Sequence, residues 1–329
     1  MDNSAMTNPA TLKELQEELN PELPIYILID PMLGEPLASV TDEIIDSGAA
    51  MAASRVAMWG REIIQIELSA KIKLPPTHFP YLVVLEGLDD PLLQTTLELA
   101  HEERNESQEE GLEGEGAAAH RIGAWLQSNM QADDLAKHLA SMLDLTSEVF
   151  TKATYLRLVD RRTFALVRHL VGDASISKKM DQLQNWVYLD VQGNISSLKS
   201  GGDAANFIVI KNAQWARLQQ GEILNRAMAL WLGEAKKLKQ NNVSEQPALA
   251  LYEPLFNALD NATQATSVWP HRFERALDSS IWAALKLLYP TFEKKPTVAQ
   301  LLQDVGTEEE PPEPMQYLHT QISALMSAA

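Results

Sequence analysis

The chain contains no cysteine among its 329 residues. This absence excludes disulfides, thiolate zinc sites and cysteine nucleophiles, and it is typical of proteins that work in a reducing compartment. Long apolar runs are also missing, since none approaches the roughly 20 residues that a membrane-spanning helix requires. The first 20 residues lack the basic and then apolar pattern of a secretory signal. We therefore expect a cytoplasmic protein without a membrane partner.

Positive charge is scarce, because 27 Lys and Arg against 45 Asp and Glu leave a net charge of -18. Such a chain repels phosphate backbones, so we expect no nucleic-acid partner. The densest basic cluster consists of Arg157, Arg161, Arg162 and Arg168, and it is too small to reverse this repulsion. Basic or hydrophobic protein surfaces remain compatible partners.

The sequence patterns that carry catalysis or hold cofactors are missing as well. Gly201 and Gly202 lack the lysine and hydroxyl partners of a phosphate-binding loop. The seven histidines are scattered, without the helical pairing of a zinc site, and no serine lies in a nucleophile elbow. Adjacent carboxylates such as Asp89 and Asp90 are better explained as turns or helix caps. The sequence therefore predicts no catalytic residue, no metal and no cofactor.

Short β-rich segments alternate with helical stripes up to about residue 200. Strands are expected at residues 23–30, 62–68, 81–85, 154–159 and 186–191. Helices are expected at residues 11–19, 40–59, 117–129, 133–145 and 163–171. The acidic segment 102–115 and the segment 192–203 are expected to be exposed loops. This pattern predicts a small mixed sheet flanked by helices.

From Asn212 onward, apolar residues recur at helical spacing. They form two stripes, one with Trp215, Leu218, Leu224, Met228 and Trp231 and the other with Leu277, Ile281, Leu285 and Leu288. An acidic, proline-rich linker at 308–314 precedes a terminal amphipathic helix, for which docking on its own lobe is favoured over docking on a partner. The predicted fold class is α+β, with these divisions: an N-terminal arm at 1–22, an α/β lobe at 23–200, a mainly helical lobe at 201–306, and the linker with the terminal helix at 307–329.

Charged residues crowd the end of the predicted strand at 154–159. Arg157, Asp160 and Arg161 can form ion pairs that lock the following helix in place. Alternatively, these guanidinium groups can form a partner-binding surface, because they suit bidentate recognition of carboxylates and backbone carbonyls. The residue types leave both interpretations open.

Five segments stand out by their order along the chain: YILID (26–30), FPYLVVLE (79–86), IGAWLQSNMQADDLAKHLASML (122–143), YLRLVDRRTFALVRHLV (155–171) and WVYLDVQGN (186–194). In this order they resemble the N-terminal domain of the type VI secretion effector chaperones, the adaptor family called Tap or TEC. The resemblance covers residues 23–191. Where the family signature has an aromatic residue before its aspartate and a proline after it, this chain has Leu158 and Val159 before Asp160 and Arg161 after it. Arg157 and Asp160 are the retained charged pair.

The resemblance implies an adaptor that is not an enzyme. Such a protein binds one toxic effector in the cytoplasm, keeps it soluble or inactive, and helps to load it onto a VgrG-like or PAAR-like spike protein. Arg157, Asp160 and Arg161 would carry the family signature, with Tyr81 and Glu86 at the end of the central strand as neighbouring surface. Two other functions stay open, namely a hydrolase whose site is assembled from distant residues and a regulatory scaffold unrelated to secretion.

Overall fold

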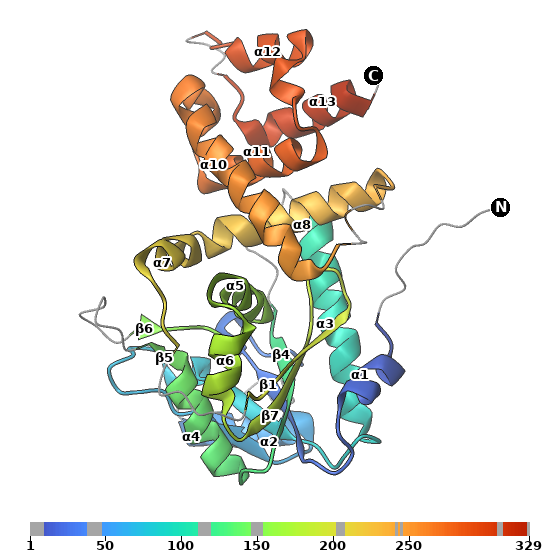
Figure 1. Ribbon diagram of the computed structural model, residues 1–329, viewed down its shortest axis with the longest axis vertical. Helices are drawn as coiled ribbons and strands as arrows, with labels where there is room; N and C mark the ends of the chain where they lie inside the picture. The colour runs from blue at the N-terminus through green and yellow to red at the C-terminus, as the bar shows by residue number, and fades with distance from the viewer. Residues whose placement is uncertain are drawn as a thin grey trace, which may run out of the picture. The chain divides into compact units, whose positions relative to one another are not determined.

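The computed structural model describes residues 10–37, 48–110, 120–145, 154–201, 208–240, 243, 246–307 and 312–327. The chain folds into two compact units (Figure 1). Of the described residues, the sheet unit contains those from 10 to 105 and from 120 to 218, and the helical unit contains residues 106–110 and those from 219 onward. The helical unit therefore includes a segment from the middle of the chain as well as its C-terminal third. The predicted α+β class is confirmed.

One six-stranded sheet forms the centre of the sheet unit. In spatial order, its strands are β2 (Ile63–Gln65), β3 (Tyr81–Val84), β1 (Ile25–Ile29), β4 (Ile122–Ser128), β7 (Leu183–Leu189) and β8 (Ile195–Lys199). All neighbouring strands in it run antiparallel, whereas a mixed sheet was expected. A separate short pair consists of β5 (Asp144–Leu145) and β6 (Thr154–Tyr155).

Both faces of the sheet are covered, which explains why its central strands are almost continuously apolar. On one face, Ile25, Ile27 and Ile29 pack into a core that includes residues of α1 (Leu12–Glu18) and α3 (Pro91–Glu110). On the other face, Phe164 of α5 (Arg161–Val171) stacks on Trp186 with ring centroids 4.3 Å apart. Both β1 and β4 are buried along their whole length.

The described part of the N-terminal arm packs onto the sheet unit. Thr11 and Glu14 form a reciprocal capping box that starts α1. Behind it, Leu15 and Leu19 are buried in the core. The backbone of Asn20 makes two hydrogen bonds with the side-chain amide of Gln127, at 2.9 and 2.7 Å. These contacts attach the arm to β4, which lies more than 100 residues away in the sequence.

Three local predictions are wrong. Residues 122–128 were predicted as part of a helix at 117–129, but they form β4. The prediction failed because a strand that is buried on both faces lacks the alternation of apolar and polar residues that identifies strands. Residues 102–110 of the predicted acidic loop belong to α3, and residues 111–115 lie outside the described part of the chain. The predicted loop 192–203 contains β8. In addition, the predicted helix at 40–59 is described only over α2 (Gly48–Trp59).

The sheet unit contains three further helices, α4 (Ala132–Leu143), α6 (Asp173–Met180) and α7 (Asn212–Gln219). Of these, α4 contacts β2 and β3, α6 contacts β8, and α7 is the last helix of the unit along the chain. The apolar stripe predicted to run from Trp215 to Trp231 is divided by a break at Gln220. Only its second part, in α8 (Gly221–Lys237), is buried.

The helical unit is built around α11 (Ala276–Leu288), which packs against α8, α10 (Tyr252–Val268) and α13 (Met315–Ser327). Along the chain, α12 (Pro296–Gln303) follows α11 and precedes α13. The terminal helix α13 docks on its own unit, where Met315, Leu318 and Ile322 are buried. The guanidinium of Arg272 binds the backbone carbonyl of Asp304, which precedes the acidic linker, and that of Glu313, which lies within it. None of the described helices combines the length and the apolar character needed to cross a bilayer.

Candidate functional site

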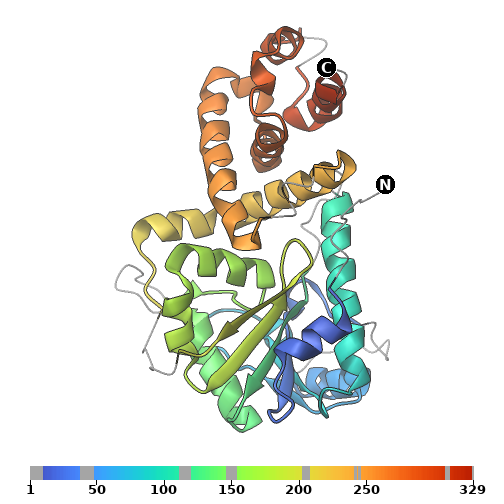
Figure 2. The ribbon, with the colours of Figure 1, turned by 45° about the vertical axis from the view of Figure 1, so that its right-hand side comes forward.

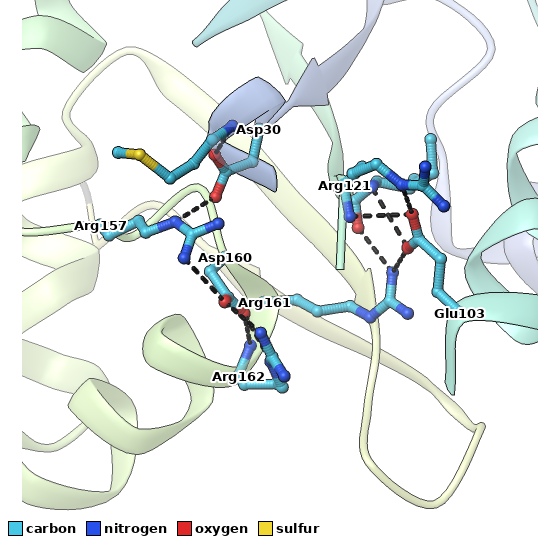
Figure 3. A network of polar contacts seen from close by, with 9 residues as sticks. Asp30, Glu103, Arg121, Arg157, Asp160, Arg161 and Arg162 are labelled. Atoms are coloured by element: carbon cyan, nitrogen blue, oxygen red, sulfur yellow. Dashed lines mark hydrogen bonds and ion pairs between the residues drawn. The ribbon is translucent and has the colours of Figure 1, made fainter. Parts of the chain in front are cut away.

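The charged residues of the predicted signature meet at one end of the sheet (Figure 3). Asp30 directly follows β1, Arg157 follows β6, and Asp160 is the N-cap of α5. The Nε of Arg157 donates to Oδ2 of Asp30 at 2.6 Å, and its Nη1 lies 3.8 Å from Asp160. Asp30 and Arg157 are 127 residues apart. Their ion pair therefore joins two distant segments of the chain.

Asp160 starts α5 and also binds the helix's second residue. Its Oδ1 accepts a hydrogen bond from the backbone N–H of Arg162 at 2.9 Å, which is the N-cap interaction. The guanidinium of Arg162 binds the same carboxylate in a bidentate manner, with Nε and Nη2 donating at 3.0 and 2.7 Å. Burial alone would raise the pKa of Asp160, but Arg162 and Arg157 outweigh it and hold this pKa below its ordinary value. Asp160 is thus ionised at neutral pH.

Arg161 points away from Asp160 and joins three elements. Its Nη1 lies 3.1 Å from Glu103 of α3 and donates to the carbonyl of Ile122 in β4 at 2.6 Å. Its Nη2 donates to the carbonyl of Ala100 at 2.7 Å. Glu103 also binds Arg121, through the backbone N–H at 2.8 Å and through Nε at 3.2 Å. Arg161 therefore links α5 to both α3 and β4.

A glycine makes room for the signature turn. Gly123 is the extra residue where the pairing of β1 and β4 shifts, so it occupies a β-bulge. A Cβ at this position would lie only 2.2 Å from the carbonyl oxygen of Val159. The turn that carries Arg157 and Asp160 consequently rests directly on the backbone of β4.

Tyr81 was expected at the surface, but it is fully buried because β3 lies inside the sheet. Its hydroxyl donates to Glu35 at 2.5 Å and accepts from Nε1 of Trp59 at 3.0 Å. The guanidinium of Arg55 lies over its ring, 4.1 Å from the centroid. These contacts form a second polar cluster inside the sheet unit.

Glu86 lies on the surface, two residues after β3, and its carboxylate is 3.7 Å from Arg61. The pairing of Tyr81 with Ile29 places the first residue of β3 beside the end of β1 that leads to Asp30. Since β3 runs from there toward Glu86, the structure does not bring Glu86 together with Arg157, Asp160 and Arg161. The five predicted site residues therefore belong to three environments.

Sequence reasoning missed Glu103, although its carboxylate is central to the network. It was hidden in the acidic run 102–115, which was interpreted as solvated. A helical stripe with Leu93, Leu97 and Ala100 continues to Glu103 at the same spacing, and all four residues are buried. A glutamate on the apolar face of a helix is the signal that could have identified it.

Several groups near this network have strongly shifted pKa values. Burial raises the pKa of Asp30 to about 6, although the guanidinium of Arg157 opposes this shift. Burial, together with the positive charges of Arg162 and Arg161, lowers the pKa of His120 well below its ordinary value. Neither ring nitrogen of His120 has a hydrogen-bond partner in the described part of the chain.

Perturbed pKa values of this kind can indicate an active site, but the geometry here indicates a structural role. Asp30 is only 1% exposed, and its two carboxylate oxygens accept from Arg157 and from the backbone N–H of Met32. The carboxylates of Asp160 and Glu103 are likewise occupied by arginines. No group of His, Asp or Glu side chains in the described ranges is arranged to hold a metal ion.

Comparisons with family models, with curated proteins and with solved structures found no match for this chain. The resemblance to effector chaperones thus depends on the five ordered segments of the sequence.

Proposed function

We propose that this protein is a non-catalytic cytoplasmic adaptor that binds one type VI secretion effector and helps to load it onto a VgrG-like or PAAR-like spike protein. The observation that best supports this proposal is the ion pair between Asp30 and Arg157. Asp30 ends the first of the family-like segments, and Arg157 lies in the fourth. A chance order of unrelated motifs would not require these two charges to meet.

The chemistry of the network favours an adaptor over a hydrolase. A hydrolase needs an acid, a base or a nucleophile that substrate can reach. In this network the carboxylates of Asp30, Glu103 and Asp160 are buried and bound to arginines. Their ion pairs connect β1, α3, β4 and α5, so they give the sheet unit a fixed shape on which a client can be bound.

This geometry also changes which residues can probe client binding. A glutamate in place of Arg157 would face the carboxylates of Asp30 and Asp160, both of which are buried. Such a charge reversal would disturb the fold itself. The client surface is therefore better sought among exposed groups outside the network.

The net charge of -18 fits an effector with a basic or hydrophobic surface. Complementary charge raises the rate of encounter and excludes acidic competitors. It also collects basic proteins without specificity, so the control in a binding experiment must carry the same charge.

The test is an affinity pull-down of the tagged chain from secretion-active cells of its native host. The control is an unrelated tagged protein of similar negative charge, and both are washed at about 0.5 M salt, where the screening length is well below 10 Å. We expect one effector and one spike protein to be retained by this chain and not by the control. Recovery of neither protein, in cells that are shown to secrete effectors, would refute the proposal.

A further inference from the structure

The outer edge of the sheet at β8 has an unusual set of free backbone groups. β7 and β8 are paired so that Leu189 faces Ile195 and Val187 faces Ser197. Just beyond this ladder, the backbone N–H of Asp190 donates to the carbonyl of Asn194 at 2.9 Å. Hydrogen-bonded and non-hydrogen-bonded pairs alternate along antiparallel strands. The pairs that contain Ile195 and Ser197 are therefore non-hydrogen-bonded, and the backbone groups of these two residues point away from β7.

Both ends of this edge are covered by the chain itself. Just before Ile195, the carbonyl of Gly193 accepts a hydrogen bond from the backbone N–H of Ala10 at 3.1 Å. At the other end, the backbone groups of Lys199 also point away from β7, and its carbonyl accepts a hydrogen bond from Oγ of Ser177 in α6 at 2.7 Å. The N–H of Gly201 donates to the carbonyl of Ser177 at 3.0 Å. For Ile195 and Ser197, in contrast, the structure shows no outward backbone partner among the described residues. Two N–H groups and two carbonyls therefore have no partner in the described part of the chain. They belong to β8, the end strand of the sheet, which lies in the yellow-green hairpin of Figure 2.

The side chains of β8 hold this edge in place. Ile195 packs against the apolar core on one face of the sheet. Ser196 accepts a hydrogen bond from Arg168 of α5 on the other face, at 3.2 Å. Ser197 donates to the carboxylate of Glu18 in α1 at 2.8 Å. A strand that is already ordered loses little conformational freedom when it binds a partner.

The edge also lacks the usual protection against pairing. Natural edge strands are blocked by proline, by inward-pointing charges or by a covering element. No proline and no charged residue occurs from Ile195 to Leu198, and the covers at Gly193 and Lys199 leave Ile195 and Ser197 between them. An extended segment can therefore reach the groups of Ile195 and Ser197.

We propose that an extended segment of the client effector binds at this edge as a seventh strand, pairing with the backbone of Ile195 and Ser197. This inference rests on the proposed adaptor function. The bound segment has no proline at its pairing positions, and it carries an apolar side chain beside Ile195 and a polar one beside Ser196. A second copy of the chain is disfavoured as the occupant, because two molecules with a net charge of -18 repel each other.

The first test compares Ser197→Pro with Ser197→Ala. Proline removes the outward N–H and places its ring at the edge, while the inward bonds of Ser196 and Leu198 to β7 remain. Alanine removes the same hydroxyl contact with Glu18 but keeps the N–H, so it is the matched control. The probe is the purified effector that the wild-type chain retains in the pull-down. We expect Ser197→Ala to bind like wild type, and Ser197→Pro to bind at least about tenfold more weakly while melting at the same temperature.

The second test uses amide hydrogen exchange on the wild-type chain, and it does not depend on whether the proline variant folds. In the free protein, the amides of Ile195 and Ser197 should exchange fast, whereas those of Ser196 and Leu198 should be protected. Saturation with the effector should slow exchange at Ile195 and Ser197.

Four results would overturn the inference. Slow exchange at Ile195 and Ser197 in the free protein at every concentration would mean that the edge is already covered. Protection that rises with the concentration of this chain alone would assign the edge to a second copy. A stable effector complex with both amides still fast would place the client elsewhere and leave the adaptor function intact. If no effector binds at all, the adaptor proposal fails and this inference fails with it.

Discussion

Replacing Arg161 by methionine tests the central claim about the signature, namely that its charges hold the fold together. The side chain of Arg161 is 3% exposed and contacts Glu103, which is 2% exposed, at 3.1 Å. Methionine keeps much of the side-chain length and removes the guanidinium. The carbonyls of Ala100 and Ile122 then lose their hydrogen bonds from Arg161, and Glu103 keeps only Arg121 and the backbone N–H groups.

The expected cost follows from the partners left behind. Removing one member of a buried ion pair costs about 3 to 5 kcal/mol, because the remaining charge stays buried. The bonds of Arg121 to Glu103 reduce this cost, whereas the loss of two hydrogen bonds to backbone carbonyls increases it. We therefore expect the free energy of unfolding to fall by about 4 kcal/mol. With a urea dependence of about 2 kcal/mol per M, the midpoint moves down by about 2 M.

Urea denaturation followed by tryptophan fluorescence measures this shift. The matched control is Lys137→Met, since Lys137 pairs with Asp134 at 3.0 Å while both side chains are mostly exposed, and such pairs contribute little. Adding Glu103→Gln to Arg161→Met should recover part of the loss, because it removes the stranded charge. An Arg161→Met midpoint that moves no further than that of Lys137→Met would refute a structural role for the network.

Three further predictions follow from the sheet unit. Gly123→Ala should lower the free energy of unfolding by about 1 to 3 kcal/mol, because its Cβ would lie 2.2 Å from the carbonyl oxygen of Val159. The control is Gly201→Ala, whose Cβ would have its nearest neighbour at 3.4 Å and which should melt like wild type. Equal melting temperatures for the two variants would contradict the prediction. His120→Asn should make the stability of the protein less sensitive to acid, because folding lowers the pKa of His120. Below about pH 6.5, the unfolded wild-type chain takes up a proton at His120 that the folded chain does not. The free energy of unfolding of the wild type therefore falls by about 1.4 kcal/mol per pH unit relative to that of the variant. The opposite contribution of Asp30, whose pKa folding raises to about 6, is present in both proteins and cancels in the difference; parallel stability curves from pH 7 to pH 5 would refute the prediction. Deleting residues 1–22 should lower the melting temperature strongly, since it removes the buried Leu15 and Leu19, each of which contributes about 2 kcal/mol; a truncated chain that melts like the intact one would mean that the arm is dispensable.

Local patterns predicted the fold where one physical rule dominates. α11 was evident because Ile281, Leu285 and Leu288 recur at helical spacing and are buried as expected. α5 ends at Val171, the last residue of the helix predicted at 163–171, and Gly172 follows it with a φ of 82°. β4 was mistaken for a helix because burial on both faces removes the alternation on which strand prediction depends. For such a run, its length and the turn residues that flank it are the remaining signals.

The candidate site was predictable only in its local part. The N-cap interaction of Asp160 with the backbone of Arg162 spans two residues, and such a contact can be predicted from residue types. The contact of Arg161 with Glu103 spans 58 residues, and that of Arg157 with Asp30 spans 127. Partners at such separations are chosen by the tertiary fold. The same reason explains why Tyr81 was expected at the surface, since its burial depends on where β3 lies in the sheet.

The network and the edge of the sheet are connected through α5. The N-terminal end of this helix is held by two ion pairs of the network, that of Asp160 with Arg162 and that of Arg161 with Glu103. Near its C-terminal end, Arg168 donates to Ser196 of β8 at 3.2 Å and to Tyr188 of β7 at 3.1 Å. Damage to the network should therefore weaken client binding only together with a loss of stability, as α5 loosens its hold on β8. A block at Ser197 should weaken binding without that loss, and this difference separates the structural signature from the binding surface.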